Sequence, residues 1–249
     1  MQNANLKNDN KKNYNYLSYI VSIYSFFFLL PSILLHKMVN LPVIGIVPIS
    51  ILFTGIYFIL LDVVTEVYGY KEGRKTLLSG LLTYTIFVFV VDSVSHISSP
   101  KNNIVWGHDQ DAHFYINLFG NLHVVWISVV ICALLTSSLN MIVLAKWKIL
   151  VMGKYFWLRS ISTSFVAAFF YSLISNLFAF GVLLGEAKFS YFIKLLLVSL
   201  FSKLFTLIIF AYPASLFCYF LKSAEGIDQY DYDLSFNPFI NLNNESLAR

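Results

Sequence analysis

Six long apolar runs constrain what this chain can fold into more than any other feature of its sequence. They extend over residues 17–35, 47–68, 76–95, 118–145, 160–184 and 191–221. An α-helix needs about 20 apolar residues to cross a bilayer, and these runs are of about that length or longer. Because apolar and polar residues do not alternate strictly within them, the pattern argues against an outer-membrane barrel. The sequence therefore predicts an all-α integral membrane protein with six transmembrane helices.

The composition agrees with this class and indicates a single membrane domain. Hydrophobic residues make up 58% of the 249 and charged residues 12%, a balance that water-soluble domains do not normally show. We expect a polar cytoplasmic N-terminus over residues 1–16, the six-helix domain over residues 17–221 and a polar tail over residues 222–249. The tail is acidic at several positions and is expected to be disordered. The first apolar run lacks a small-residue cleavage pattern, so it is expected to remain as the first span.

The distribution of Lys and Arg predicts the orientation of the helices. If the N-terminus is cytoplasmic, the inner segments hold twelve Lys and Arg residues and the outer loops hold three. Because cytoplasmic loops carry an excess of these residues, both termini are predicted to be cytoplasmic. The net charge of +4 lies mostly in loops and has no basic-aromatic motif beside it, so it indicates membrane topology rather than nucleic-acid binding.

Two carboxylates lie where lipid depth disfavours them. Asp62 and Glu66 are four residues apart in the second apolar run, so on a helix they share one face with Thr65 beside them. Ionisable residues in a membrane segment usually face the bundle interior or an aqueous cavity, which makes this pair a candidate functional site. The alternative is that both carboxylates reach the inner boundary and pair with Arg74 or Lys75.

Three further ionisable residues lie at or near lipid depth. These are Asp92, Arg159 and Lys203, and a polar cavity shared with the two carboxylates is the simplest way to accommodate both signs of charge. Arg159 follows Trp157, so interfacial anchoring is its alternative role. Lys203 could instead extend outward to the membrane surface. Pro213, ten residues later, is expected to kink the same helix beside a cavity.

The sequence contains no recognisable catalytic or cofactor-binding motif. It has no nucleophile elbow, no His-Glu-x-x-His and no phosphate-binding glycine loop, so we predict no enzyme activity and no cofactor. Cys132 and Cys218 lie far apart in apolar runs and are expected to be buried hydrophobes. The outer loop over residues 98–114 contains His and Asp, but their spacing favours a solvated lid over a metal site. Because the sequence has no phosphate-binding loop, any energy coupling must come from an ion or a partner subunit.

The carboxylate region also carries a family resemblance. The segments Asp62, Thr65-Glu66-Val67-Tyr68-Gly69 and Arg74-Lys75 together resemble the signature of the vitamin uptake transporter family, in particular its queuosine precursor transporter branch. Leu158-Arg159 with Ser162-Thr163 is similar to that family's fifth-span entrance, and Lys203 with Pro213 is similar to its last span. The similarity covers residues 46–221. Residues 164–172 depart from the pattern, because the Gln and the Asp expected after the Ser-Thr pair are absent.

The resemblance implies a six-helix importer in a bacterial inner membrane, similar in appearance to the substrate-binding components of energy-coupling-factor transporters. Its implied substrates are 7-cyano-7-deazaguanine and its aminomethyl relative, which serve tRNA queuosine synthesis. One carboxylate, with Glu66 as the main acceptor, can accept the ring N–H and the amine of a deazaguanine together. Tyr68, Phe170 or Tyr171 can stack on the flat ring, with ordinary packing as the alternative. The residues expected to bind substrate are Glu66, Asp62, Thr65, Tyr68, Arg159 and Lys203.

Three interpretations remain open from the sequence. The first is a self-sufficient importer of queuosine precursors. The second is a binding subunit for a purine-like or vitamin substrate that requires an ATPase partner. The third is a structural membrane protein whose buried charges only set the helix register.

Overall fold

The computed structural model describes residues 14–41, 45–97, 116, 119, 120, 122–178, 189–232 and 234. Within these residues the chain forms a helical bundle. Its helices are α1 (Leu17–Ile33), α2 (Ser50–Tyr68), α3 (Tyr70–Ser95), α5 (Leu122–Cys132), the π-helix η1 (Ala133–Ser137), α6 (Ser138–Leu150), α7 (Phe156–Phe178) and α8 (Phe189–Glu225). Because α5, η1 and α6 are continuous along the chain, they form a single long helix.

The helices have the length and composition of membrane spans. Five in the described ranges are long and apolar enough to cross a bilayer: Ser50–Tyr68, Tyr70–Ser95, Leu122–Leu150, Phe156–Leu177 and Leu196–Glu225. The helix α1 is also apolar but has only 17 residues. The expected all-α membrane architecture is therefore observed, with five clear candidate spans and one shorter apolar helix.

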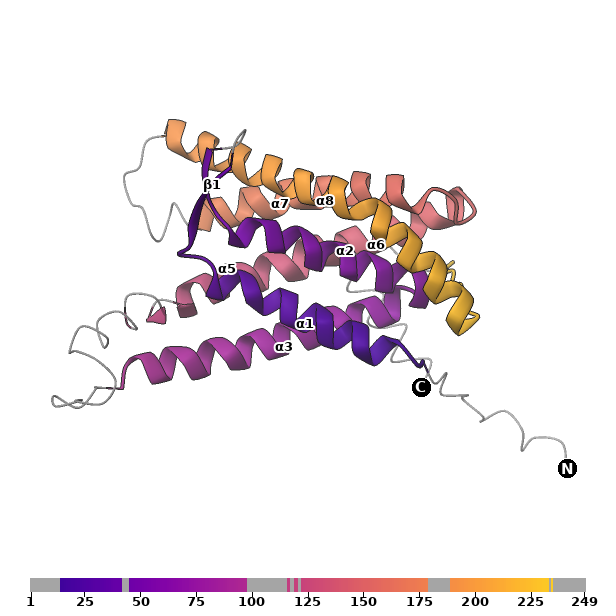
Figure 1. Cartoon of the computed structure of the whole chain (residues 1–249), viewed down its shortest axis with the longest axis horizontal. Coiled ribbons are helices and arrows are strands. Elements are labelled where there is room, and N and C mark those ends of the chain that lie inside the picture. Colours follow the sequence, from indigo (N-terminus) through magenta and orange to yellow (C-terminus); the bar gives the residue numbers. More distant parts are fainter. Residues whose placement is uncertain are drawn as a thin grey trace, which may run out of the picture.

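The helix α2 lies at the centre of the bundle. It packs against α1, α3, α6, α7 and α8, and all of its residues from 61 to 68 are buried. Figure 1 shows α2 between α1 and α3 on one side and α7 and α8 on the other. The two carboxylates predicted on the second span are therefore on the most enclosed helix of the bundle.

The connection between α1 and α2 is a short hairpin. Strand β1 (Met38–Leu41) pairs antiparallel with β2 (Gly45–Pro48), with Met38 opposite Pro48 and Leu41 opposite Gly45. Pro42 and Pro48 lack backbone donors and restrict the residue before them, so together they disfavour a regular helix through this segment. The hairpin lies at the end of the bundle opposite to the end of α8 (Figure 1), and we call its end the hairpin end.

Several helix boundaries differ from those expected from the sequence, and one of the largest shifts is at the start of the third span. The third span was predicted to begin at Thr76, but α3 begins at Tyr70, so the basic residues around Arg74 are helical. Gly69 makes the sharp turn from α2 to α3, with a φ of 88° that favours glycine. The last helix was predicted to end at Leu221, but α8 continues to Glu225. The segment after it contacts the bundle as far as Asp231, although the tail from residue 222 was expected to be disordered.

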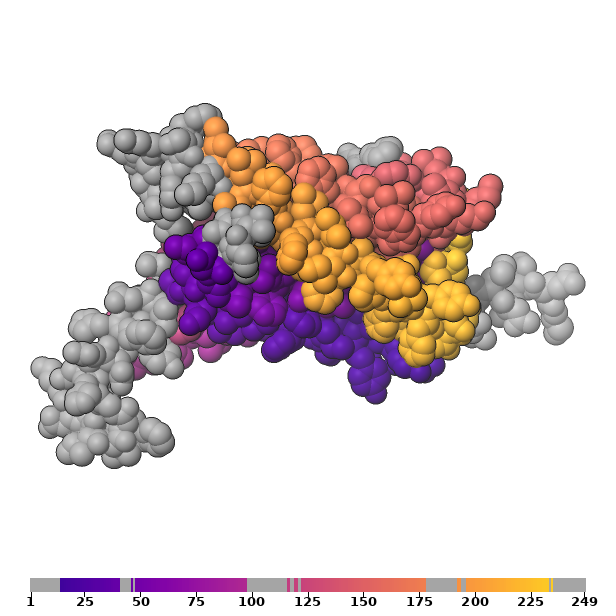
Figure 2. Space-filling model, turned by 45° about the horizontal axis from the view of Figure 1, so that its top comes forward, coloured from indigo at the N-terminus to yellow at the C-terminus, as the bar shows by residue number. Residues whose placement is uncertain are grey.

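Large apolar side chains cover the outside of the bundle. On α3 and α8 they include Leu82, Ile86, Phe201 and Tyr219, each more than half exposed. In Figure 2 the orange α8 lies along this surface between the salmon α7 and the indigo α1 and α2. Extended apolar surface on helices of spanning length is what contact with lipid requires. The chain is therefore a multi-pass membrane protein.

The contact between α2 and α8 depends on one glycine. A Cβ added at Gly55 would lie 2.6 Å from Cβ of Thr206 on α8, so the two backbones approach closely there. Gly55→Ala should push the helices apart and lower the free energy of unfolding by about 1–3 kcal/mol, the usual cost of overpacking. Thermal unfolding in detergent measures this. Val90→Leu adds the same single carbon at an exposed position of α3 and should leave the melting temperature unchanged; equal shifts would refute the close contact.

Candidate functional site

A row of residues spaced four apart runs along one face of α2. It consists of Ser50, Thr54, Phe58, Asp62 and Glu66. Residues at this spacing lie above one another on a helix, so the row leads from the hairpin end to the other end of the bundle. All of its members except Thr54 are buried. The row therefore runs inside the protein and ends in the two carboxylates.

A second row on α7 faces the first. It consists of Ser160, Ser164, Ala168, Ser172 and Asn176, again four residues apart. Ser160 and Ser164 both donate hydrogen bonds to Asp62 on α2, which shows that the two rows meet. Small side chains allow two membrane helices to approach closely. The two rows thus enclose a narrow strip that is mostly polar.

Asp62 lies fully buried in this strip and is held by neutral donors. Asn140 donates from Nδ2 to Oδ1 at 2.6 Å, and Ser160 and Ser164 donate to Oδ2 at 2.6 and 2.8 Å. Within the ranges that the structure describes, no Lys, Arg or His nitrogen lies within 4 Å of this carboxylate. The π-helix η1 directly precedes α6, which carries Asn140, and such bulges are frequent at functional sites. Asp62 is thus a carboxylate whose partners are all uncharged.

Glu66, one turn further along α2, is surrounded by cations. Nη2 of Arg159 lies 3.1 Å from Oε1 and 3.0 Å from Oε2, and Nζ of Lys222 lies 2.7 Å from Oε1. Nζ of Lys148 is 3.9 Å from Oε1 and donates to the Glu66 carbonyl oxygen. Asp228 completes the group by pairing with Lys148 at 2.5 Å and Lys222 at 2.9 Å. We call these five residues the ionic cluster, and the end of the bundle that holds it the cluster end.

A cavity of about 270 Å³ opens at the hairpin end, lined by α1, α2, α5, α7 and α8. Its polar lining includes Ser32, Thr54, Ser128, Ser175, Asn176 and Lys203. Lys203 is 4% exposed and donates from Nζ to Oγ of Ser172 at 2.8 Å, with Nζ 4.2 Å from the centre of the Tyr171 ring. Its side chain therefore points into the bundle, and the alternative of outward extension is not observed. Nδ2 of Asn176 has no hydrogen-bond partner within the described part of the chain.

An aromatic pair separates the cavity from Asp62. Phe58 and Tyr171 lie edge to face, with their ring centres 5.8 Å apart. On α2, Phe58 stands between Thr54, which lines the cavity, and Asp62, and these two residues are about 12 Å apart along the helix. The strip therefore has four levels: the cavity, the aromatic pair, Asp62 and the ionic cluster.

The structure brings together only some of the residues expected to bind substrate. Asp62, Glu66 and Arg159 lie close together near the cluster end, as expected. Lys203 lies in the cavity, about 28 Å from Lys222 along α8, so it does not belong to the same group. The cavity expected to be shared by all five ionisable groups is thus not formed.

Thr65, Tyr68 and Asp92 lie outside the strip. The Thr65 hydroxyl donates a hydrogen bond to the Leu61 carbonyl of its own helix, and the side chain packs against α3. Tyr68 donates to Glu225 at the end of α8. Asp92 lies toward the hairpin end, where His123 Nδ1 is 3.1 Å from its carboxylate. Thr65 and Tyr68 thus connect α2 to the neighbouring helices α3 and α8. They lie on faces of α2 that point away from the polar strip.

The ion-pair partners of Glu66 do not come from the basic start of α3, which was the alternative left by the sequence. Lys75 pairs with Glu72 on its own helix, whereas Glu66 pairs with Arg159 and Lys222.

The His and Asp residues of the loop over residues 98–114 lie outside the described residues. Among those that are described, no group of three or more His, Cys, Asp or Glu side chains could hold a metal ion.

Sequence reasoning missed Asn140 and three members of the ionic cluster. Asn140 binds Asp62, and Lys148, Lys222 and Asp228 belong to the ionic cluster. An Asn inside an apolar run was a usable signal, since amides in membrane helices often hydrogen-bond across to a neighbour. The other three offered no comparable signal, because charged residues beside a span end are ordinary anchors or tail residues.

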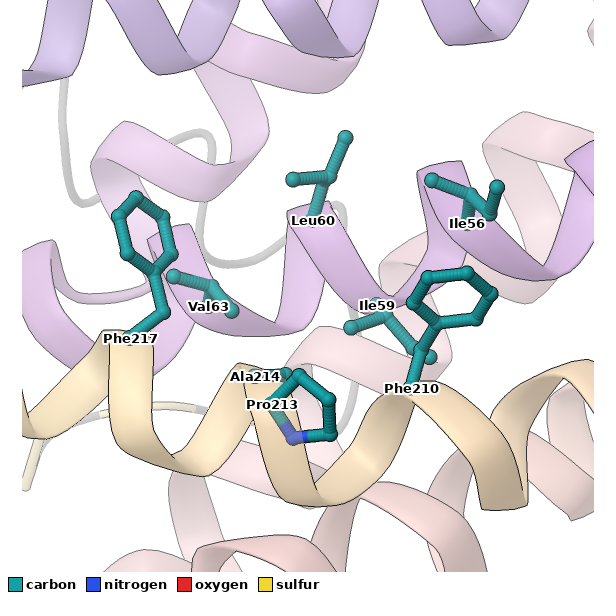
Figure 3. A pocket seen from close by; sticks show the side chains of 8 residues that line it. All are labelled: Ile56, Ile59, Leu60, Val63, Phe210, Pro213, Ala214 and Phe217. Carbon is teal, nitrogen blue, oxygen red and sulfur yellow. The ribbon is translucent and has the colours of Figure 1, made fainter.

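A second hollow in the bundle is unsuited to a polar ligand. It has a volume of about 180 Å³ and lies between α2 and α8 around Pro213. Figure 3 shows Phe210 and Phe217 of α8 extending toward α2. All of the side chains that line it are apolar, so it lacks the groups that orient a polar substrate.

The fold and the strip define a multi-pass membrane protein with a polar interior. A family model described as "Putative vitamin uptake transporter" matches residues 48–218. The match extends from the end of β2 into the second half of α8 and covers well over half of the chain. The chain therefore belongs to this family of transporters, which is not a class of enzyme. Comparisons with curated proteins and with solved structures found no match.

The ionic cluster generates a stability prediction. Glu66→Gln removes the charge of a buried carboxylate that faces three cations, and breaking a buried ion pair in this way usually costs about 3–5 kcal/mol. The variant should therefore melt at a clearly lower temperature in detergent. Glu72→Gln makes the same change in the exposed pair with Lys75 and should change stability by about 1 kcal/mol or less. If the two variants melt alike, the cluster does not stabilise the fold.

A second prediction concerns the pH range in which the Asp228 carboxylate stabilises the fold. Burial raises the pKa of its carboxyl, but hydrogen bonds from Lys148 and Lys222 lower it, and the net pKa lies below the ordinary 3.8. Glu66 and Tyr230 are the other titratable groups near it. Since the folded pKa is depressed, the carboxylate stabilises the fold fully above pH 3.8 and loses this effect as the pH falls through the lowered pKa. The difference in melting temperature between wild type and Asp228→Asn should thus stay constant from about pH 5 to 8 and shrink below pH 3.8.

Proposed function

We propose that the chain is a bacterial inner-membrane importer of queuosine precursors, with 7-cyano-7-deazaguanine as its main substrate and the aminomethyl relative as a further one. In this proposal six helices span the membrane, both termini are cytoplasmic and the cluster end faces the cytoplasm. Membership of a family of uptake transporters supports import of a small molecule. The resemblance around Asp62, Arg159 and Lys203 supports the choice of substrate.

The observation that carries this proposal is the polar strip between α2 and α7. It connects a cavity at one end of the bundle with a buried carboxylate and then with a closed ionic cluster at the other. Transporters place their substrate between two barriers that open in turn. A cavity on one side and a closed cluster on the other fit a state that is open toward the outside.

The cavity offers groups that suit the acceptor side of a deazaguanine. Lys203 has three donors, of which Ser172 takes one, and the amide of Asn176 supplies another donor. These groups can bind the ring carbonyl and the nitrile of the substrate. The face of Tyr171 lies beside them and can stack on the flat ring, an interaction that contributes about 1–3 kcal/mol for a base.

Asp62 is the acceptor that we propose for the donor side of the substrate. Its partners are two hydroxyls and an amide, which a ring N–H and an exocyclic amine can replace without separating charges. Glu66 was expected to fill this role, but its partners are cations that a neutral base would have to displace. We therefore propose Glu66 and Arg159 as part of the inner barrier and Asp62 as the contact to the substrate.

Uptake into liposomes that contain only this chain tests the proposal. Labelled 7-cyano-7-deazaguanine should accumulate, and the unlabelled compound should compete better than guanine, which lacks the nitrile. Binding without uptake would instead favour a subunit that requires an ATPase partner. Absence of both would favour a structural membrane protein.

Two substitutions test the assigned contacts. Asp62→Asn places a donor against the donors of the substrate, so binding should weaken by about 1–3 kcal/mol, or roughly ten- to hundredfold in affinity. Lys203→Met keeps most of the length of the side chain but removes its donors, so it should reduce uptake while leaving insertion intact. Lys75→Gln, at the exposed start of α3, is the control and should change little. Calorimetry in detergent measures the affinities, and wild-type affinity in Asp62→Asn would place the site elsewhere.

A further inference from the structure

The segment after α8 folds back over the cluster end. α8 ends at Glu225, and Gly226, with a φ of 64°, turns the chain. We call residues 226–232 the C-terminal strap. It was expected to be part of a disordered tail, yet it makes specific contacts with three helices of the bundle.

Backbone contacts attach the strap to the turn between α2 and α3. The Gln229 N–H donates to the Val67 carbonyl at 3.3 Å, and Lys148 donates to the Gln229 carbonyl at 2.6 Å. Asp231 accepts a hydrogen bond from the Tyr70 N–H at 2.8 Å, where α3 begins. The strap therefore joins the ends of α2, α3 and α6 to the end of α8, from which it continues.

The charge of Asp228 is needed by the cluster that the strap covers. Arg159, Lys148 and Lys222 come from α7, α6 and α8, and without the strap Glu66 is the only carboxylate within 4 Å of any of them in the described chain. Three cations then face one carboxylate, and like charges in a low dielectric repel strongly. Asp228 adds the second carboxylate and pairs with both lysines. The strap thus supplies the charge that lets these helix ends stay together.

We propose that the C-terminal strap is a latch: it holds the cluster end shut while Asp228 is bound, and its release lets α6, α7 and α8 separate around Glu66. This step goes beyond the proposed function, because it does not depend on which substrate the cavity accepts. It assigns the strap a role in the conformational change that any import through the strip requires.

A native cysteine reports on this opening. Cys218 is 3% exposed and lies four residues before Lys222, on the same face of α8, so it becomes accessible when the cluster end separates. Cys132 is also buried but lies next to the cavity, where its Sγ is 4.0 Å from the Tyr171 carbonyl. The two thiols thus report on opposite ends of the strip.

The experiment measures the rate at which a membrane-impermeant maleimide labels Cys218 from the strap side in the full-length Cys132→Ala protein. Asp228→Asn keeps the shape of the side chain but removes its charge, so labelling should become about tenfold faster, within the usual range of conformational couplings. Glu72→Gln removes a carboxylate that the strap does not touch and should leave the rate within about twofold of its parent. Asp228→Glu should restore slow labelling.

Two results would overturn the latch. Equal labelling of Cys218 in Asp228→Asn and Glu72→Gln would mean that the strap does not hold the end shut. The second result comes from Cys132 in a Cys218→Ala background that also carries Asp228→Asn. Faster labelling of Cys132 as well would mean that the substitution loosens the whole bundle rather than releasing one end.

Discussion

Two buried carboxylates on α2, together with the groups that compensate their charge, determine much of this structure. A carboxylate taken out of water must be supplied with donors or cations, or it strongly destabilises the fold. The helix carries two carboxylates one turn apart, and the bundle compensates them differently: Asp62 has neutral donors and Glu66 has cations. Because these partners come from α6, α7 and α8, the two carboxylates specify which helices pack around α2 at this end. The polar strip and the closed cluster are two consequences of the same requirement.

The two kinds of compensation give the two levels different properties. Hydroxyl and amide donors around Asp62 can rotate and can be replaced by a ligand that brings its own donors. The cations around Glu66 cannot leave singly without exposing an unpaired charge in a dry interior. Under the proposed function, exchange with a substrate is therefore easier at Asp62, and resistance to separation is greater at Glu66. The proposed binding level and the proposed barrier level lie only about 6 Å apart along one helix.

Much of the fold could be predicted from the sequence, because spanning length and apolar content are properties of single segments. The shared face of Asp62 and Glu66 also follows from spacing alone. The orientation of Lys203 did not follow, since a lysine near a span end can turn inward or outward with nearly the same local pattern. The contact of Asn140 with Asp62 depends on packing between helices far apart in sequence, and on a π-helix that shifts the register before α6. The strap was missed because polar composition suggested disorder, whereas the buried cations of the cluster supply the charge that binds it.

The last helix links the two ends of the strip. Lys203 lines the cavity, Lys222 belongs to the cluster, and Pro213 lies about midway between them. Proline interrupts the hydrogen-bond ladder of a helix, so the two halves of α8 can change their relative direction at lower cost than in a continuous helix. Water that enters as the whole cluster separates hydrates all of its ions, so opening the cluster costs less than removing one of its charges while the others stay buried. Under the proposed function, a change of direction at Pro213 and separation of the ionic cluster are the two changes that open the cluster end during alternating access.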